Sequence, residues 1–337
     1  MLNHADLEKL ADAVVAVIRE KPNQSFSFSW LADELKTDSD AIQQAVHHAT
    51  GWGYGLEIRR NERVQFISPP DSLFATEIQY DLRTKWLGKT VLSYRAVKST
   101  NDLAAEMANA GAAEGTVITA EQQIEGRGRL GRTWFSPFGS GVYVSVIFRP
   151  AFEPESAPGM SVMTALALLD AIVACSPGEA RLKQISLKWP NDLLIGGRKV
   201  AGILTELATE DRVISHVVIG IGINVNASPN EFPEEIADTA TSIYREIGRK
   251  INRVELLRAF LRNLEKQYST YLVHGLKKDH DKIRKYSSLI GHEVTLQAGR
   301  VRMQGLVKDI DADGRLMLQT DDGLQPIIAG EVTVVKE

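Results

Sequence analysis

A break near residue 70 is the feature that most constrains how this chain can fold. Two adjacent prolines lie among small polar residues at positions 68–72, and such a run interrupts both helices and strands. Apolar residues before the break recur at helical spacing, whereas strand and helix patterns alternate after it. With 337 residues, the chain is long enough for more than one core. We therefore predict three domains, at residues 1–70, 71–285 and 286–337.

Before the break, the pattern is that of a winged helix-turn-helix. Apolar residues recur at helical spacing from Leu7 to Ile18, and two shorter helices are predicted next, the second over residues 38–50. Residues 56–66 then alternate between apolar and polar, as a β-hairpin does. Helices followed by such a hairpin are typical of small DNA-binding domains.

The charges of this first segment do not favour DNA. It holds seven Lys or Arg against ten Asp or Glu, and the helix over 38–50 has no Lys or Arg. Neutralisation of phosphates supplies much of the affinity of a protein for DNA. These charges therefore leave open whether the first segment binds operator DNA. The alternative is a retained winged helix that packs against the rest of the chain or binds a protein. The candidate DNA contacts, in a helix-turn-helix at 28–47 and in the hairpin, are Ser39, Gln43, Gln44, Arg59, Arg60 and Arg63.

After the break, the elements alternate in the manner of an α+β fold with a mixed sheet backed by helices. We predict helices over 74–87, 101–110, 159–174 and 253–272, and strands at 90–94, 116–121, 141–148, 200–207 and 213–225. From residue 286 onwards, short strands alternate with Asp-Gly turns, which indicates a small barrel.

The composition excludes several classes of protein. Cys175 is the one cysteine, so no disulfide can form within the chain, which favours the cytoplasm. The net charge of −4 gives no overall attraction to nucleic acid. No apolar run approaches the roughly 20 residues that cross a bilayer, and the N-terminus lacks the pattern of a signal peptide. We expect a cytoplasmic protein without a membrane contact.

The strongest chemical motif is the glycine–arginine loop at residues 126–132, which contains three glycines and three arginines. Glycine lets the backbone approach a ligand closely, and the guanidinium fork matches phosphate and carboxylate oxygens. Such a loop can close over a polyanion and exclude water. A solvated basic loop or an RNA-binding segment is the alternative. The aromatic run that follows, from Trp134 to Phe138, indicates that the loop belongs to a folded domain.

A second motif joins two lysines to a Trp-Pro-Asn-Asp sequence at residues 189–192. Two consecutive glycines, at 196 and 197, are expected to turn a hairpin that returns Lys199 beside Lys188. Asp192 is a candidate for holding Mg²⁺ or for orienting a lysine. Either lysine alone would most simply be a solvated surface charge, but the two together around this sequence favour a site.

Two shorter motifs complete the set. Residues 220–226 carry Gly-x-Gly after a strand, but the third glycine of a dinucleotide fingerprint is absent. Asn224 is therefore interpreted as a contact to a purine edge, or the segment as a closely packed strand end. Residues 98–101, Lys-Ser-Thr-Asn, can cap a helix or present hydroxyl and N–H groups to a polar ligand.

Taken together and in this order, the motifs resemble those of the biotin protein ligase family, in particular the bifunctional type that also represses the biotin operon. The resemblance spans nearly the whole chain. It implies a class II synthetase-like catalytic domain, a C-terminal SH3-like barrel, and a reaction that uses biotin, ATP and Mg²⁺. The implied product is biotinyl-5′-AMP, from which a lysine of a biotin carboxyl carrier protein, a subunit of acetyl-CoA carboxylase, receives biotin.

The resemblance also implies roles for individual residues. Those assigned to biotin are Ser99, Thr100, Asn101, Gln123, Arg127, Gly128, Arg129, Lys199 and Gly202. Those assigned to ATP and the adenylate are Arg127, Arg129, Arg132, Trp134, Lys188, Asn191, Lys199 and Asn224. Those assigned to catalysis are Lys199, Arg129, Lys188 and Asp192, the last also as the Mg²⁺ ligand.

One departure from the family pattern stands beside the loop, because Ile124 and Glu125 occupy positions where small residues are more usual. Three alternatives stay open: a lipoate ligase, a biotin-sensing regulator without turnover, and a Gly-Arg nucleic-acid-binding module. If the first segment does bind DNA, a homodimer on a two-fold operator, with biotinyl-AMP as corepressor, is expected.

Overall fold

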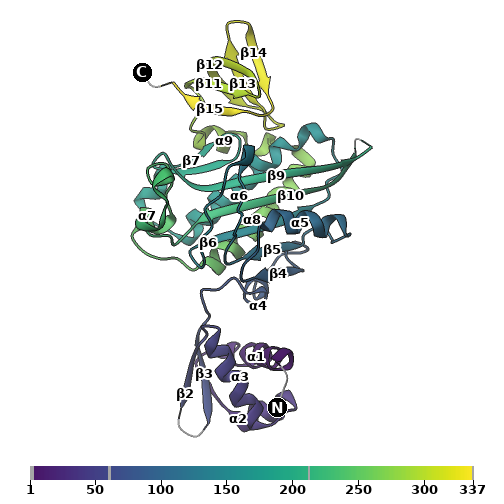
Figure 1. The fold of residues 1–337 in the computed structure, drawn as a ribbon, viewed down its shortest axis with the longest axis vertical. Helices are drawn as coiled ribbons and strands as arrows, with labels where there is room; N and C mark the ends of the chain where they lie inside the picture. The colour runs from purple at the N-terminus through teal and green to yellow at the C-terminus, as the bar shows by residue number, and fades with distance from the viewer. Residues whose placement is uncertain (1–3, 60–61, 212, 336–337) are drawn as a thin grey trace. The chain divides into compact units, whose positions relative to one another are not determined.

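The computed structural model describes residues 4–59, 62–211 and 213–335. By its internal contacts the chain divides into two compact units, Met1–Ser72 and Leu73–Glu337 (Figure 1). The division falls at the end of the proline-containing segment at residues 68–72.

The first unit packs three helices against a small antiparallel sheet with the strand order β1-β3-β2. Its elements are α1 (His4–Arg19), β1 (Ser25–Ser27), α2 (Phe28–Leu35), α3 (Ser39–Gly51), β2 (Gly55–Arg59) and β3 (Arg63–Ser68). The side chain of Ser27 caps α2, while Asp38 caps α3 by accepting from the N–H of Ala41 at 2.7 Å. Ile18, Leu31 and Ile42 are fully buried, so the apolar faces of all three helices meet in one core.

The second unit is built on a seven-stranded mixed sheet with the order β4-β5-β6-β10-β9-β8-β7. The strands are β4 (Val91–Tyr94), β5 (Val117–Ala120), β6 (Gly141–Phe148), β7 (Ile185–Lys188), β8 (Asp192–Ile195), β9 (Arg198–Glu210) and β10 (Val213–Asn224). The pair β4 and β5 is parallel and the other pairs are antiparallel. The fold is therefore α+β with a mixed sheet, as the sequence predicted.

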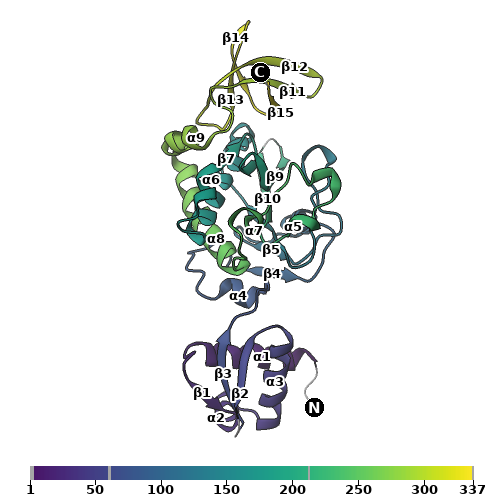
Figure 2. The ribbon, with the colours of Figure 1, turned by 90° about the vertical axis from the view of Figure 1, so that its left-hand side faces the viewer.

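Helices cover both faces of this sheet, with α6 (Pro158–Cys175) and α8 (Arg253–His274) on one side and α5 (Thr100–Asn109) on the other (Figure 2). By length and composition, α6 is apolar enough to cross a membrane, so the expectation that no run approaches that limit was wrong. However, 72% of the helix is buried inside the unit, which is the environment of a core helix. The shorter elements are α4 (Ala75–Gln79), α7 (Ile243–Ile247), α9 (His280–Tyr286) and the 3-10 turns η1 (Arg129–Gly131), η2 (Pro154–Ser156), η3 (Ala180–Gln184), η4 (Pro229–Glu231), η5 (Glu234–Ile236) and η6 (Lys277–Asp279).

The helix predicted over 74–87 is wrong in its length, because α4 spans only five residues. Asp81 and Arg83 adopt left-handed backbone angles, with φ of 56° and 57°, which no α-helix accommodates. The backbone N–H groups of residues 85–87 donate instead to the carboxylate of Glu265 on α8. A tertiary contact with a residue far away in the sequence thus replaces the local helix.

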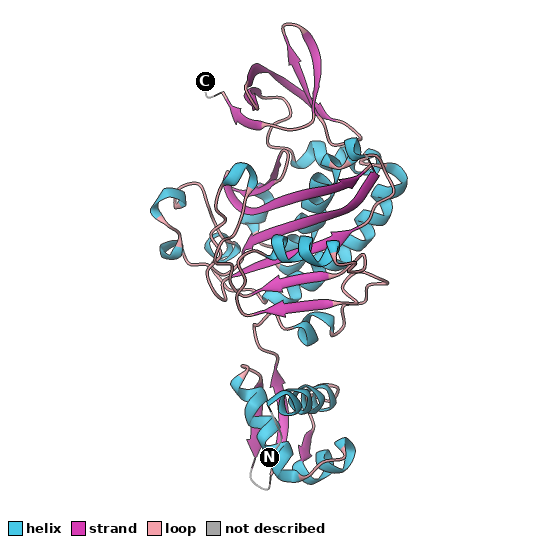
Figure 3. Cartoon of the chain, turned by 45° about the vertical axis from the view of Figure 1, so that its right-hand side comes forward, coloured by secondary structure: helices cyan, strands magenta, loops and turns pink. Residues whose placement is uncertain are grey.

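The C-terminal segment forms a five-stranded antiparallel sheet with the order β14-β13-β12-β11-β15. Figure 3 shows this part of the chain, next to the C-terminus, as strands joined by loops. Its strands are β11 (Glu293–Ala298), β12 (Val301–Ile310), β13 (Leu316–Thr320), β14 (Gly323–Ile327) and β15 (Glu331–Val334). The turn between β12 and β13 contacts the segment between β7 and β8, since the indole of Trp189 donates to the carbonyl of Gly314 at 2.8 Å. A Cβ at Gly314 would lie 2.6 Å from the Cα of Gly159, so only glycine permits this close approach.

Candidate active site

A cavity of about 570 Å³ opens on the second unit where all four motifs meet. It is lined by each residue that the sequence assigned to biotin, ATP or catalysis: Ser99, Thr100, Asn101, Gln123, Arg127, Gly128, Arg129, Arg132, Trp134, Lys188, Asn191, Asp192, Lys199, Gly202 and Asn224. Segments more than a hundred residues apart in the sequence therefore share one site. Its volume is in the range of small-molecule and cofactor pockets.

One end of the cavity is a network of neutral polar groups around the start of α5. The side-chain oxygen of Gln123 accepts from the N–H of Thr100 at 2.9 Å and from its hydroxyl at 3.0 Å. The amide nitrogen of Gln123 donates to Ser136 at 3.0 Å. Ser99 caps α5 by accepting from the N–H of Asp102 at 3.4 Å. This end offers oriented hydroxyl and amide groups without a formal charge, which suits an uncharged polar ring.

Asn101 supports this network and does not face the cavity with free polar atoms. Its amide nitrogen donates to Glu206 at 2.8 Å and to the carbonyl of Leu204 at 3.3 Å, while its oxygen accepts from Ser145 at 2.6 Å. A Cβ at Gly220 would lie 2.0 Å from that oxygen, so the sheet needs glycine there to admit the side chain. Asn101 lines the cavity, so the biotin contact that the resemblance implied stays a prediction, and these hydrogen bonds also position the start of α5.

The glycine–arginine loop, residues 126–132, folds back on itself as a narrow arch. The N–H of Gly128 donates to the carbonyl of Arg132 at 2.7 Å, and the N–H of Trp134 donates to Gly126 at 2.8 Å. Leu130 at the tip has a φ of 55° and is 73% exposed. The loop is thus ordered by its own backbone, with its apolar tip in solvent.

The three loop arginines have different partners. Arg127 contacts Asp102 and Glu206, and Arg132 forms an ion pair with Glu331. Arg129 donates to neutral acceptors, the side-chain oxygen of Asn191 at 3.0 Å and the carbonyl of Gly330 at 3.3 Å. Burial lowers the pKa of Arg129, and nearby Asp192 and Glu331 offset this only in part.

The predicted pair of lysines lies around Asp192. Lys188 on β7 pairs in register with Asp192 on β8, and the Nζ of Lys199 lies 2.7 Å from the Oδ1 of Asp192. The two glycines do turn the hairpin between β8 and β9, with φ of 58° and 78°. Lys199 thereby returns next to the carboxylate that faces Lys188. Among the described residues, Lys188 makes no ion pair, so its charge is available to a ligand.

Trp134 covers two glycines that face each other across neighbouring strands, Gly202 and Gly222. A Cβ would lie 2.2 Å from the indole nitrogen at Gly222 and 3.0 Å from the ring at Gly202. Lys199 stacks over the same ring, 5.2 Å from its centroid. The indole nitrogen is buried and has no hydrogen-bond partner in the described chain. Of the two glycines in the Gly-x-Gly motif, Gly222 thus makes space for the indole of Trp134, whereas Gly220 makes space for Asn101.

Asn224 at the end of β10 is 7% exposed, and its amide nitrogen donates to the carbonyl of Thr241 at 3.0 Å. One of the two N–H groups of the Asn224 amide is therefore already used. The amide oxygen and the other N–H remain for the predicted contact with a purine. Its position in the cavity wall still places it near a bound ligand.

Sequence reasoning missed the contribution of the C-terminal sheet. Gly330, Glu331, Val332 and Thr333 line the cavity, and two of them hold loop arginines. No motif marks these residues, and they lie about two hundred positions after the loop. Phe232 and residues 238–240 also line the cavity, again without a sequence signal.

Few side chains in the cavity could bind a metal ion. Among the residues that the structure describes, no group of three or more His, Cys, Asp and Glu side chains is placed to hold a metal ion. Mg²⁺ that arrives with ATP commonly needs only one or two protein carboxylates, because phosphates and water supply the other ligands. Asp192 provides one such carboxylate beside the lysines, so the residues fit a nucleotide-bound Mg²⁺ and not a dedicated metal cage.

The candidate DNA contacts lie in the first unit. Gln43 and Gln44 are exposed on α3, and Ser39 begins that helix. Arg59 pairs with Glu57 at 2.9 Å, and Arg63 donates to the hydroxyl of Ser25 at 3.0 Å. Arg60 lies outside the described residues.

Comparisons with known proteins agree with this site. Residues 93–224 match the model of the biotin/lipoate A/B protein ligase family, and residues 289–335 match that of the biotin protein ligase C-terminal domain. The bifunctional ligase/repressor BirA of Bacillus subtilis is 33% identical over 95% of this chain and 97% of its own length. The chain belongs to the biotin protein ligase family.

Other relatives match over smaller shares. BirA of Escherichia coli is 28% identical over 90% of this chain and 91% of its own. The biotin–[acetyl-CoA-carboxylase] ligase of Paracoccus denitrificans is 32% identical over 64% of this chain and 88% of its own. A biotin protein ligase of Aquifex aeolicus, solved in complex with biotin and ATP, superposes with a TM-score of 0.62 at 28% identity, over 74% of this chain and all of that one. The catalytic fold of the family is therefore present.

Proposed function

We propose that this protein is an ATP-dependent biotin protein ligase that makes biotinyl-5′-AMP and then transfers biotin to a carrier lysine. The observation that supports this most directly is one cavity that joins an uncharged polar end to a cluster of cations. The first suits the ureido ring of biotin, and the second suits the carboxylate and the phosphates. The Aquifex aeolicus ligase holds biotin and ATP, and we assign the same two ligands to this cavity.

In the first step, a carboxylate oxygen of biotin bonds to the α-phosphorus of ATP, and the bond from that phosphorus to the bridging oxygen of pyrophosphate breaks. Ser99, Thr100 and Gln123 orient the ring. Lys199 and Arg129 bring two anionic oxygens together and stabilise the charge that develops between them. Lys188 balances charge on the departing pyrophosphate. Bound Mg²⁺, held through Asp192, would further neutralise the phosphates.

In the second step, the ε-amine of the carrier lysine attacks the acyl carbon, AMP leaves, and the amine loses its proton. An acyl phosphate is prone to hydrolysis, so the glycine–arginine loop has to exclude water until the carrier arrives. Since the Paracoccus denitrificans relative is named for acetyl-CoA carboxylase, we assign the biotin carrier of that enzyme as the acceptor.

Incubation of the protein with biotin, ATP, Mg²⁺ and a carrier domain should give biotinylated carrier and one pyrophosphate per transfer. Lipoate in place of biotin should give little transfer, because its dithiolane ring cannot form the hydrogen bonds that a ureido ring would form with this polar end of the cavity. Transfer of lipoate alone would identify a lipoate ligase, and binding of biotin without pyrophosphate release would identify a regulator that has lost turnover.

For the flanking segments we propose a winged helix-turn-helix at residues 1–70, a catalytic domain at 71–285 and an SH3-like barrel at 286–337. The order of α1, α2, α3 and the β2–β3 hairpin supports the first. The five antiparallel strands β11–β15 support the last.

We also propose that the first unit binds operator DNA as part of a homodimer, with biotinyl-AMP as corepressor. Exposed Gln43 and Gln44 on α3 can read base edges. Anisotropy of the upstream DNA of its own gene, at two salt concentrations, should show binding that requires the adenylate. We expect a shallow salt dependence, because α3 has no lysine or arginine. No binding with or without adenylate would contradict the proposal.

A further inference from the structure

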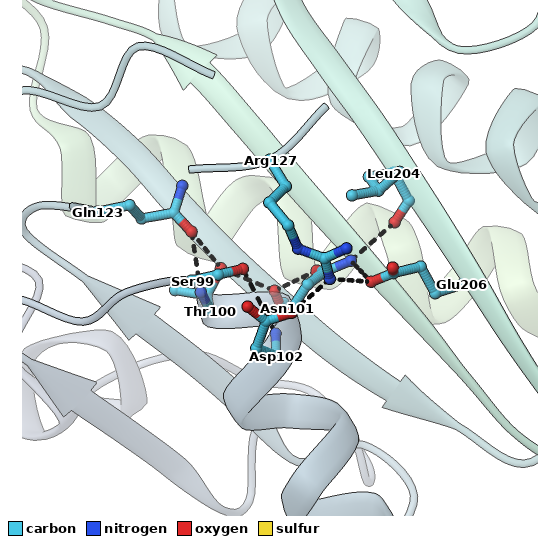
Figure 4. A network of polar contacts seen from close by, with 9 residues as sticks. Ser99, Thr100, Asn101, Asp102, Gln123, Arg127, Leu204 and Glu206 are labelled. Carbon is cyan, nitrogen blue, oxygen red and sulfur yellow. Dashed lines mark hydrogen bonds and ion pairs between the residues drawn. The ribbon is translucent and has the colours of Figure 1, made fainter. Parts of the chain in front are cut away.

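Two carboxylates beside the cavity have no role in the reaction described above. Asp102 lies in the first turn of α5, and Glu206 lies on β9. The guanidinium of Arg127 lies 2.5 Å from the Oδ1 of Asp102 and 2.9 Å from the Oε2 of Glu206 (Figure 4). Burial opposes the charged form of Arg127, but the two carboxylates outweigh it and raise its pKa. The two carboxylates therefore compensate the positive charge of Arg127 and hold its guanidinium in place.

Glu206 serves the loop and the polar end of the cavity at the same time. The oxygen that contacts Arg127 also accepts from the amide of Asn101 at 2.8 Å. Asn101 follows Thr100, whose N–H and hydroxyl both donate to Gln123. A single carboxylate oxygen thus connects the glycine–arginine loop to the groups that would orient the acyl ring (Figure 4).

The other loop arginines are held differently. Arg129 has only neutral hydrogen-bond acceptors, and Arg132 has one carboxylate, Glu331. Of the three, Arg127 alone contacts two carboxylates. If Arg127 moved away, two negative charges would face each other without a cation between them. If Arg129 moved away, it would expose only a neutral amide oxygen and a neutral carbonyl. The loop is therefore fixed at its first arm, and Arg129 is the arginine that can turn toward a ligand.

We propose that Asp102 and Glu206 form a latch that holds the first arm of the loop over the cavity and so retains the acyl adenylate between the two steps. Both act through Arg127 and are positioning residues. The inference rests on the proposed ligase reaction, because retention matters only if an adenylate forms. A lid that opened freely would release the intermediate and admit water.

The test follows pyrophosphate release with biotin, ATP and Mg²⁺ in the absence of carrier. In the wild type, the retained adenylate blocks the site, so release should stop near one pyrophosphate per protein. In Asp102→Asn, Glu206→Gln and the double variant, the adenylate should escape and release should continue. The double variant should lose adenylate about tenfold faster than the wild type, as expected for two partly exposed ion pairs.

Glu206→Gln tests the latch without disturbing the fold. The glutamine oxygen can still accept from Asn101, while the charge facing Arg127 is lost. Asp102→Asn, whose side chain is 46% exposed, provides a second variant with little risk to the fold. The matched control is Glu179→Gln, which breaks a comparably exposed pair with Arg249 away from the cavity and should stop near one equivalent like the wild type.

The outcomes are distinct. Continued release by the latch variants alone supports the inference. If pyrophosphate release stops at one equivalent in all proteins, the latch is overturned and the ligase proposal stays intact. The same conclusion follows if pyrophosphate release by the wild type never stops. A variant with a damaged fold would release less than one pyrophosphate per protein and would not continue to release it. No pyrophosphate from the wild type would contradict the proposed function itself, and the latch with it.

Discussion

Lys199→Ala should lower the rate of biotin transfer by roughly 10²–10³-fold, the usual effect of removing a group that stabilises developing charge. Lys199 stands between the carboxylate of Asp192, 2.7 Å away, and the ring of Trp134. We propose that a biotin carboxylate and the α-phosphate approach each other beside this amine, within the same cavity. The measurement is the initial rate of transfer to a carrier domain, together with the KM values for biotin and ATP.

Two further variants sharpen this result. Lys199→Arg keeps the charge but changes its shape, so it should recover part of the activity. Lys183→Ala removes an exposed lysine on η3 outside the cavity and should leave the rate unchanged. Wild-type activity in Lys199→Ala would remove Lys199 from the catalytic site, and an equal loss in Lys183→Ala would point to nonspecific damage.

Glu121→Ala should destabilise the second unit by about 3–5 kcal/mol, because it removes the carboxylate that faces a buried guanidinium. The side chain of Arg253 is 2% exposed and donates to Glu121 at 2.7 Å. The same carboxylate accepts from the N–H of Leu73, where the second unit begins. The midpoint of urea unfolding, followed by tryptophan fluorescence, measures the loss.

The matched control for this prediction is Glu125→Ala, four residues further along the chain. The Glu125 side chain is 62% exposed and pairs with Lys98 at 3.4 Å, so its loss should cost less than about 1 kcal/mol. In the double variant Glu121→Ala with Arg253→Met, part of the stability should return, because no charge is then left buried. Equal midpoints for Glu121→Ala and the wild type would contradict the argument.

Periodicity in the sequence was sufficient for most elements of the fold. The helix around α8 shows an apolar face at helical spacing. The strand predicted at 141–148 is buried along its whole length and α6 along most of its own, so both stand out in the sequence as apolar runs. The helix over 74–87 was wrong because Glu265, nearly two hundred residues later, satisfies backbone donors that a helix would have used. Periodicity carries no information about such a distant acceptor.

For the candidate site, the sequence by itself determined which residue types were present and that a cationic loop, two lysines and a neutral polar turn belonged to one chemistry. Only the tertiary structure decided what each side chain does. Arg127 and Arg129 are equivalent in the sequence, yet one is held by two carboxylates and the other by neutral acceptors. Glu331 reaches the loop from β15 without any motif. The physical reason is that charge and hydrogen bonding depend on distances between atoms, and the fold sets those distances between residues far apart in the chain.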